Sequence, residues 1–420
     1  MLIHESNSLV EKTPFIIFSL ILSFLLLIAI PFTAHRFFSV LKLIKSKFME
    51  SSRPRIVSKP LIPPAQRISS LDGLRGLTVF FVFYSHYLSN VDAGLYTPWI
   101  QVFSMGVPIF FTLSGLLISI SYQPTRDLRG VLAFYLRRLF RTYPLYFLLV
   151  MLAFFHHQFS VEDLFSYLTF SFGITSPHVS PNYIGIIWSL FCEEVFYLLF
   201  PIIFLICRNW LSSILFLAFI VFIEIYSRTL LNQHTNLLFG PGSSFLSNFH
   251  FFIGGILLFR LKDTGFLDFY AAFSRKTHRL LTEVVFLFAF VFFLYIGIRH
   301  YAVFATFSIS LLALFTNSFT SRLFQNPSFV FIGQLCYPIY LIHNIIAFSF
   351  TRILLERLPP PLVYFSAIFE LLIILSISFC LSKFIEIPLQ KIGKRFSKLL
   401  SPLHRDTLTE RLPSTTSMGI

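Results

Sequence analysis

The sequence predicts an all-α protein, a polytopic bundle of membrane-spanning helices. Of its 420 residues, 55% are hydrophobic and only 12% are charged, whereas about 25% of the residues of a typical soluble domain are charged. The mean hydropathy is +0.76, and phenylalanine alone occurs 57 times. The apolar residues form many separate runs, each long enough to cross a hydrocarbon core of about 30 Å. This pattern excludes a soluble domain with a single membrane anchor.

Eleven apolar runs are long enough to span the membrane. They lie at 14–32, 72–91, 99–121, 133–155, 183–206, 211–229, 244–261, 280–297, 301–317, 333–353 and 363–386. The first run is longer than the apolar part of a signal peptide, and no small-residue cleavage site follows it. We therefore expect a retained helix there. The 161–175 stretch is apolar but short, and we expect it to be interfacial or re-entrant.

Along this map, loops rich in basic residues alternate with loops that contain none. The basic residues gather in four segments: 33–70, 122–141, 260–279 and the tail beyond 386. The alternate loops 92–98 and 156–182 contain neither Lys nor Arg. Cytoplasmic loops carry the excess of basic residues in membrane proteins. The pattern predicts an N-terminus outside the membrane and a C-terminus in the cytoplasm.

The same features predict four parts of the chain. We expect an extra transmembrane helix in 1–35, a basic cytosolic linker in 36–67, a transmembrane domain in 68–390 and a basic cytosolic tail in 391–420. The net charge of +14 reflects membrane topology rather than nucleic-acid binding. The four cysteines show neither disulfide nor metal-site spacing. We therefore expect no metal site.

The 72–91 run carries Arg75 near its cytosolic end and His86 near its external end. Eleven residues separate them, which is three helical turns plus about 20°, so both lie on one face about 16 Å apart. Ionisable side chains at membrane depth usually face the bundle interior or a polar cavity. The alternative is a histidine bonded to a neighbouring carbonyl, with the arginine extending to lipid headgroups.

Three arginines, Arg137, Arg138 and Arg141, lie at the cytosolic start of a later span. Guanidinium groups pair bidentately with phosphate, and a helix N-terminus adds positive potential. The cluster therefore suits a phosphorylated ligand. Ordinary anchoring at the cytosolic surface is the alternative interpretation.

Further polar residues lie inside predicted spans. Glu193 and Glu194 have no basic neighbour in their own helix, so at least one must point inward. A hydrogen-bonding clamp between helices is the alternative. Ser114 precedes a glycine in another span, a pairing that usually indicates close helix packing. Tyr340 and His343 lie deep in a third span, where Pro338 predicts a kink.

Taken in order, these motifs resemble acyltransferase family 3, the bacterial membrane acyltransferases that modify exported glycans. The resemblance covers about residues 68–390. It rests on SLDGLRG, the Arg75–His86 spacing, GVPIFFTLSG, the three arginines, Trp188-Ser189-Leu190 with Glu193, Tyr340-Leu341-x-His343 and Glu386-x-Pro388. It implies a ten-helix core, to which the 14–32 helix is an addition. The sequence departs from the family at Pro338, where a small polar residue is expected.

The resemblance implies a bacterial cytoplasmic-membrane enzyme that transfers an acyl group, often acetyl, from cytosolic acyl-CoA to a hydroxyl of an external glycan. O-antigen or another surface polysaccharide is the expected acceptor. We expect acetyl-CoA or another acyl-CoA as co-substrate, with no tightly bound cofactor.

The resemblance also implies roles for the residues that match its motifs. Arg75 and the three clustered arginines would meet the donor phosphates. His86 would be the general base or carry the acyl group, and Glu193 would orient the imidazole or pair with an inward arginine. The expected pocket residues are Ser114, Trp188, Tyr340 and His343.

A transporter or flippase of a glycan or lipid-linked precursor is the alternative function. Intramembrane glutamate and histidine can also form proton relays. Many transporters contain inverted repeats, and this sequence shows no internal repeat. The arginines are also concentrated on the cytosolic side, which favours the acyltransferase.

Overall fold

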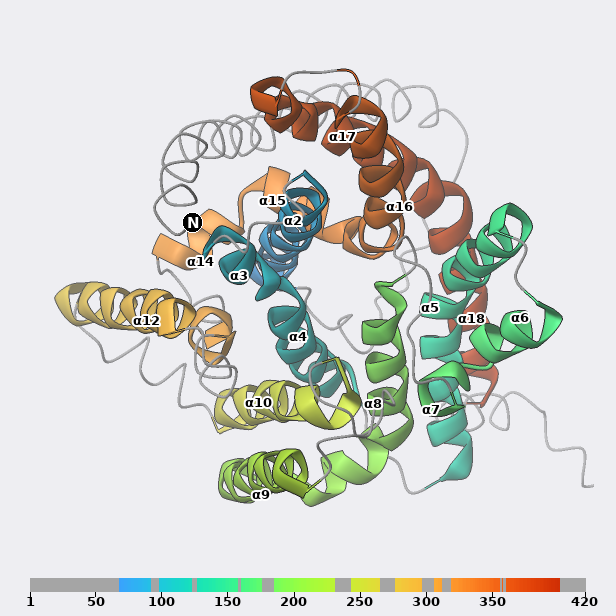
Figure 1. Ribbon diagram of the computed structural model, residues 1–420. Coiled ribbons are helices and arrows are strands. Elements are labelled where there is room, and N and C mark those ends of the chain that lie inside the picture. Colours follow the sequence, from blue (N-terminus) through green and yellow to red (C-terminus); the bar gives the residue numbers. More distant parts are fainter. Residues whose placement is uncertain are drawn as a thin grey trace, which may run out of the picture.

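The computed structural model describes residues 68–91, 98–122, 127–157, 160–175, 185–230, 243–264, 276–296, 306–311, 319–355, 357 and 360–400. Within these ranges the chain is almost entirely helical and contains no strand (Figure 1). The predicted all-α fold class is confirmed for this part of the chain. The predicted 14–32 helix, the 36–67 linker and the end of the tail lie outside the described residues.

The helices follow one another along the chain from the first described segment to the last. In order they are α2 Ser69–Val91, α3 Pro98–Ser104, α4 Gly106–Ser121, α5 Leu128–His157, α6 Val161–Leu168, α7 Phe172–Thr175, α8 Ile187–Ile206, α9 Trp210–Leu230, α10 Phe245–Asp263, α12 Lys276–Ile296, α14 Phe319–Phe324, α15 Pro327–Gln334, α16 Cys336–Leu355, α17 Pro360–Leu381, a π-helix Ser382–Glu386 and α18 Ile387–Leu400.

Five helical segments in the described ranges are long and apolar enough to cross a membrane, and a bent pair makes a sixth. The five segments are Val102–Ser121, Leu128–Phe155, Ile187–Ile206, Trp210–Ser227 and Phe365–Leu400. Each overlaps a predicted span. Helices α2 and α10 also cover predicted spans but carry more polar residues, and α12 contains a shorter apolar segment, Leu280–Phe290. A multi-pass membrane protein follows from these helices, while the count of ten plus one stays a prediction.

The predicted 333–353 span differs from a continuous helix. Helices α15 and α16 meet at Leu335 and are bent by 73°. Pro338 lies in the first turn of α16, where the missing backbone N–H has no intrahelical partner to lose. The bend falls three residues before Pro338, in the turn where a proline cannot pair with the i−4 carbonyl oxygen, so the predicted kink is found in this segment.

Helix α2 lies at the centre of the bundle, surrounded by α3, α4 and α15 to α17 (Figure 1). Its contact with α15 is so close that a Cβ atom on Gly333 would lie 1.7 Å from the carbonyl oxygen of Asp72. Helices α4 and α10 cross in the same way, since a Cβ atom on Gly115 would lie 2.1 Å from the Phe252 carbonyl oxygen. Small residues permit such backbone contact between helices in membranes.

Large apolar side chains are exposed on the peripheral helices. On α9 they include Leu215, Phe219 and Phe222, and on α12 Val284 and Phe288. Both helices lie at the rim of the bundle (Figure 1). Exposed apolar surface of this extent is what a lipid-facing wall requires.

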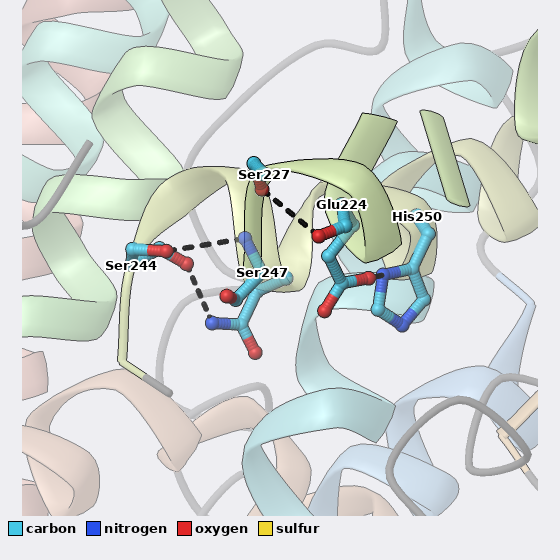
Figure 2. Close-up of polar contacts among 6 residues, drawn as sticks. Glu224, Ser227, Ser244, Ser247 and His250 are labelled. Atoms are coloured by element: carbon cyan, nitrogen blue, oxygen red, sulfur yellow. Dashed lines mark hydrogen bonds and ion pairs between the residues drawn. The ribbon is translucent and has the colours of Figure 1, made fainter. Parts of the chain in front are cut away.

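A buried acid–base pair joins α9 to α10 (Figure 2). The Nδ1 atom of His250 lies 3.0 Å from Oε2 of Glu224, and both side chains are fully buried. Beside them, Ser244 caps α10 by accepting the backbone N–H of Ser247 at 3.2 Å. Neither Glu224 nor His250 lines the cavities described below. No sequence motif marks this pair, and its place between α9 and α10 indicates a structural clamp.

We expect Glu224→Ala to destabilise the protein by about 3–5 kcal/mol, because removing one partner leaves the other polar group buried without its counterpart. Thermal unfolding of the purified protein in detergent measures the loss. Ser227→Ala is the matched control, since it removes only a hydroxyl that donates to the Glu224 carbonyl oxygen within α9. Equal melting temperatures for wild type and Glu224→Ala would show that the pair does not clamp the helices.

Candidate active site

Two adjoining cavities lie beside α2. The inner cavity has a volume of about 60 Å³ and the outer cavity about 580 Å³. Helices α2, α4, α5, α8 and α16 contribute to both linings. The residues common to both cavities are Arg75, Ser114, Arg141, Tyr197, Cys336 and Tyr337. Because they share these walls, the cavities follow one another as a wide chamber and a narrow end.

The arginines lie where the two cavities meet. Arg75 from α2 and Arg141 from α5 line both cavities, while Arg138 lines the outer one. Arg138 donates to the Ser121 hydroxyl at 3.0 Å, and its guanidinium lies 5.3 Å from the centre of the Tyr197 ring. The structure thus brings together three of the four predicted donor-binding residues. Arg137 is half-buried and lines neither cavity.

Glu193 is the acidic centre of the inner cavity. Its Oε1 accepts hydrogen bonds from the Ser114 hydroxyl at 2.8 Å and from the Tyr197 hydroxyl. It also interacts electrostatically with Arg138 and Arg141. No ion pair joins Glu193 to an arginine within the described ranges, so both roles expected for Glu193 stay predictions. No hydrogen bond connects Glu193 to a histidine within the described ranges.

Glu194 points to a different neighbour. Its Oε1 accepts a hydrogen bond from the Thr142 hydroxyl at 2.7 Å, and the Thr142 carbonyl oxygen accepts one from the Tyr337 hydroxyl. These bonds join α8, α5 and α16. Of the two adjacent glutamates, Glu193 therefore lines the cavity and Glu194 ties the helices around it. The sequence alone did not distinguish the two.

The two predicted histidines face each other. The rings of His86 on α2 and His343 on α16 have centroids 5.1 Å apart. Nδ1 of His343 lies 2.6 Å from the Tyr340 carbonyl oxygen. A carbonyl oxygen only accepts, so Nδ1 carries the proton and Nε2 of the neutral ring keeps its lone pair. That Nε2 is buried and has no hydrogen-bond partner among the described residues.

The Tyr340 side chain connects the histidines to the inner cavity. Its ring centroid lies 5.6 Å from that of His343, and its hydroxyl is hydrogen-bonded to Ser189. Both Tyr340 and Ser189 line the inner cavity. Trp188 packs edge-on against Phe111, with their ring centroids 6.1 Å apart. It lines neither cavity.

A second polar network holds the C-terminal part of α2. The hydroxyl of Tyr87 lies 3.1 Å from that of Ser366 on α17. Ser366 and Thr351 of α16 both donate to Oε1 of Glu370, at 3.2 Å and 2.8 Å. The network joins three helices next to His86. Buried polar groups require such partners at membrane depth, and the sequence analysis did not identify this one.

The geometry defines a class of protein: a multi-pass membrane protein whose core encloses arginines, a hydrogen-bonded carboxylate and a histidine pair. The family model described as "Acyltransferase domain" matches residues 68–382. The chain belongs to this family, acyltransferase family 3. The resemblance inferred from the sequence motifs is thereby confirmed.

Curated relatives agree with this family. The chain is 24% identical over 375 residues to "Putative O-acetyltransferase SACOL0978" of Staphylococcus aureus, covering 78% of this chain and 58% of that protein. It is 28% identical over 173 residues to "Peptidoglycan O-acetyltransferase OatA" of Listeria monocytogenes, covering 35% and 25%. It is 30% identical over 144 residues to "Putative acetyltransferase ORF330" of Acidianus two-tailed virus, covering 33% and 40%.

The chain spans less than two thirds of the length of each of these relatives. No solved structure matches it significantly.

We expect Ser114→Ala to weaken the site because Glu193 loses a hydroxyl donor in a buried position. Hydrogen bonds to charged groups contribute about 1.5–3 kcal/mol, so the melting temperature of the variant should be lower than that of the wild type. A double-mutant cycle with Glu193→Gln should give a coupling energy of about 0.5–3 kcal/mol, the range for residues in one network. Ser119→Ala, whose hydroxyl donates only to the Gly115 carbonyl oxygen, is the control. Additive effects of the two changes would show that the bond does not stabilise the site.

Proposed function

We propose that this protein transfers an acyl group, acetyl in the first instance, from cytosolic acyl-CoA to a hydroxyl of an extracytoplasmic glycan. The single observation that carries the proposal is the order of groups along the cavities. Arginines line the outer cavity, a carboxylate lies at the inner cavity, and Tyr340 leads from there to two histidines. The anionic donor would reach these groups from the arginine end, and the acceptor hydroxyl would reach them from the histidine end.

The proposed orientation places the arginines at the cytosol. The basic loops at 122–141 and 260–279 and the basic tail support this side, because cytoplasmic segments carry the excess of Lys and Arg. The N-terminus would then lie outside and the C-terminus inside a bacterial cytoplasmic membrane. The histidines, near the other end of α2, would face the external acceptor.

The donor would bind with its phosphates at Arg75, Arg138 and Arg141. Arginine suits this role because its planar guanidinium pairs bidentately with phosphate oxygens. From Arg75 to His86 the distance along α2 is about 16 Å, which the extended pantetheine arm of CoA can cover. The inner cavity of about 60 Å³ has room for a small acyl group such as acetyl.

The transfer itself needs a base beside the acceptor hydroxyl. Imidazole suits this role because its unperturbed pKa lies near neutrality. In direct transfer, the imidazole takes the hydroxyl proton as the acceptor oxygen attacks the thioester carbon. The new C–O bond forms, the C–S bond breaks, and the CoA thiolate leaves and takes up a proton. In two-step transfer, His86 first carries the acyl group and then passes it to the hydroxyl.

His343 would support His86 in either route. Its Nδ1–H is held by the Tyr340 carbonyl oxygen, which fixes the ring with Nε2 free to accept a proton. A flippase would consume no acyl-CoA, and this distinguishes the alternative function from the proposed one. The related Listeria protein is named a peptidoglycan O-acetyltransferase, which supports a glycan as the acceptor class here.

Replacement of His86 tests the proposed base. We expect His86→Ala to lower acyl transfer by about 10²–10⁴-fold, the usual contribution of general base catalysis. Donor affinity should stay near the wild-type value, because the phosphate-binding arginines lie about three turns away. Acylated glycan is measured by mass spectrometry together with membrane abundance of each variant.

The control for His86→Ala is Ser89→Ala, an exposed position of the same helix whose hydroxyl donates only to the Ser85 carbonyl oxygen. It should keep full transfer. Full transfer by His86→Ala at normal abundance would contradict the assignment of His86 as base. Trapping of an acylated His86 would establish the two-step route.

Lysine substitutions test the donor phosphates. Arg138→Lys and Arg141→Lys keep the positive charge but lose the bidentate fork, so we expect acyl-CoA affinity to fall about ten-fold. Arg137→Lys should have a smaller effect, since Arg137 lines neither cavity. Arg129→Lys, an exposed position in the first turn of the same helix, is the control. Unchanged acyl-CoA affinity in Arg138→Lys and Arg141→Lys would show that these arginines do not bind the donor phosphates and only set the membrane topology.

A further inference from the structure

Helix α18 carries cations that the function proposed above does not use. Its sequence contains four basic residues and no acidic one. Lys394 lines the outer cavity, whereas the other three basic residues line neither cavity. These three are exposed: Lys391, Arg395 and Lys398. Their role must therefore be sought on the outer surface of the helix.

The residues of α18 divide into three sectors around the helix axis. At 100° per residue, Gly393 and Ser397 share one sector, and both are buried. The three exposed cations fall within about 60° of one another on a second, cationic sector. Three exposed apolar side chains fall within about 60° of one another on the third, apolar sector: Ile392, Phe396 and Leu399. The outward surface of α18 is thus amphipathic, with a cationic sector beside an apolar one.

Contact with α5 fixes which sectors face outward. Helices α5 and α18 lie side by side (Figure 1), and a Cβ atom on Gly393 would lie 2.4 Å from the Cβ of Phe140. The Phe140 and Phe396 rings stack with centroids 6.2 Å apart, yet Phe396 stays 52% exposed and Leu399 72% exposed. The part of the chain that the structure describes therefore leaves the apolar sector largely uncovered.

The length of the last helical segment places α18 relative to the bilayer. Phe365–Leu400 has 36 residues, which is about 54 Å at 1.5 Å per residue. The hydrocarbon core is only about 30 Å thick. Because the basic residues of α18 lie at the C-terminal end of this segment, that end is the one that leaves the core. The exposed sectors of α18 are thus at the level of the lipid headgroups or just beyond it.

Anionic phospholipids have the chemistry that both sectors require. A lysine or arginine close to an anionic membrane surface strengthens binding by about five-fold. Helices with a basic face and with Phe or Leu on the adjoining face bury the apolar side at the boundary between headgroups and acyl chains. With no acidic residue in α18, nothing in the helix itself repels a negatively charged headgroup. A zwitterionic lipid would match the apolar sector only.

We propose that α18 is a docking surface for anionic phospholipid of the cytoplasmic leaflet. The cationic sector binds the headgroup phosphate, and the apolar sector contacts the adjoining acyl chains. The bound lipid holds α18 at the membrane surface and, through the Gly393 contact, also steadies α5. This inference goes beyond the proposed function, because it requires neither an acyl donor nor an acceptor.

The test measures lipid binding to the purified full-length protein in detergent by native mass spectrometry. Phosphatidylglycerol, which is anionic, and phosphatidylcholine, which carries no net charge, are titrated separately. We expect wild type to bind phosphatidylglycerol about ten-fold more tightly, because more than one cation can contact a headgroup. The triple variant Lys391→Gln/Arg395→Gln/Lys398→Gln should lose most of this preference. Leu399→Ser should weaken the binding of both lipids and keep the preference.

The matched control removes three positive charges from exposed positions on other helices and loops of the predicted cytoplasmic side: Arg129→Gln/Arg208→Gln/Lys262→Gln. It should keep the ten-fold preference. Equal affinity of wild type for the two lipids would overturn the inference. An equal loss of preference in the two triple variants would also overturn it, since the attraction would then be general. A dimer that Leu399→Ser abolishes, with lipid binding unchanged, would assign the apolar sector to a second copy of the chain instead.

Discussion

The close contact of α2 with its neighbours is the constraint on which the site depends. Backbone touches backbone where Gly333 of α15 meets Asp72, and larger side chains have no room there. Lipid provides little hydrophobic force between helices, so such contact and buried hydrogen bonds must supply the stability. Because α2 is held in this way, Arg75 and His86 are fixed at the two ends of one rigid element. The distance between Arg75 and His86 is thereby set by helix geometry.

Membrane depth imposes the second constraint, that buried polar groups must be paired or line a cavity. The structure satisfies this requirement in two ways. Glu224 with His250, and Oε1 of Glu370 with Thr351 and Ser366, form contacts between helices. Nε of Arg75, a residue that lines both cavities, has no hydrogen-bond partner in the described ranges, and neither do Nε2 of His343 and Oε2 of Glu370, whose residues line neither cavity. An unpaired donor beside a cavity is suited to a ligand, and paired groups in a helix contact are suited to stability.

In the proposed function, this arrangement would let one enzyme serve reactants on both sides of a membrane. The outer cavity is wide and cationic, and the inner cavity is about ten times smaller. In the proposed function, the wide cavity would hold the nucleotide part of a CoA-type donor, and the narrow cavity would hold the thioester. The histidines lie beyond Tyr340, outside both linings. The acceptor would therefore reach them without sharing the path of the nucleotide.

Several features could be derived from the sequence alone. Composition and run length predicted the all-helical membrane fold, because the thickness of the bilayer sets how many apolar residues a span needs. The order of short motifs predicted the family, and helical periodicity placed Arg75 and His86 on one face of α2. These are properties of one segment at a time. They require no knowledge of which helices are neighbours.

Tertiary structure decided what depends on neighbouring helices. The sequence could not show that Glu193 meets Ser114 while Glu194 meets Thr142, since both glutamates lie in the same helix one residue apart. Nor could it show that Arg138 lines a cavity and Arg137 does not, that the bend falls at Leu335, or that Lys394 joins the arginines. Each of these facts depends on a contact between segments far apart in the chain. Local sequence sets the direction of a side chain on its own helix, but only the packed bundle determines what that side chain meets.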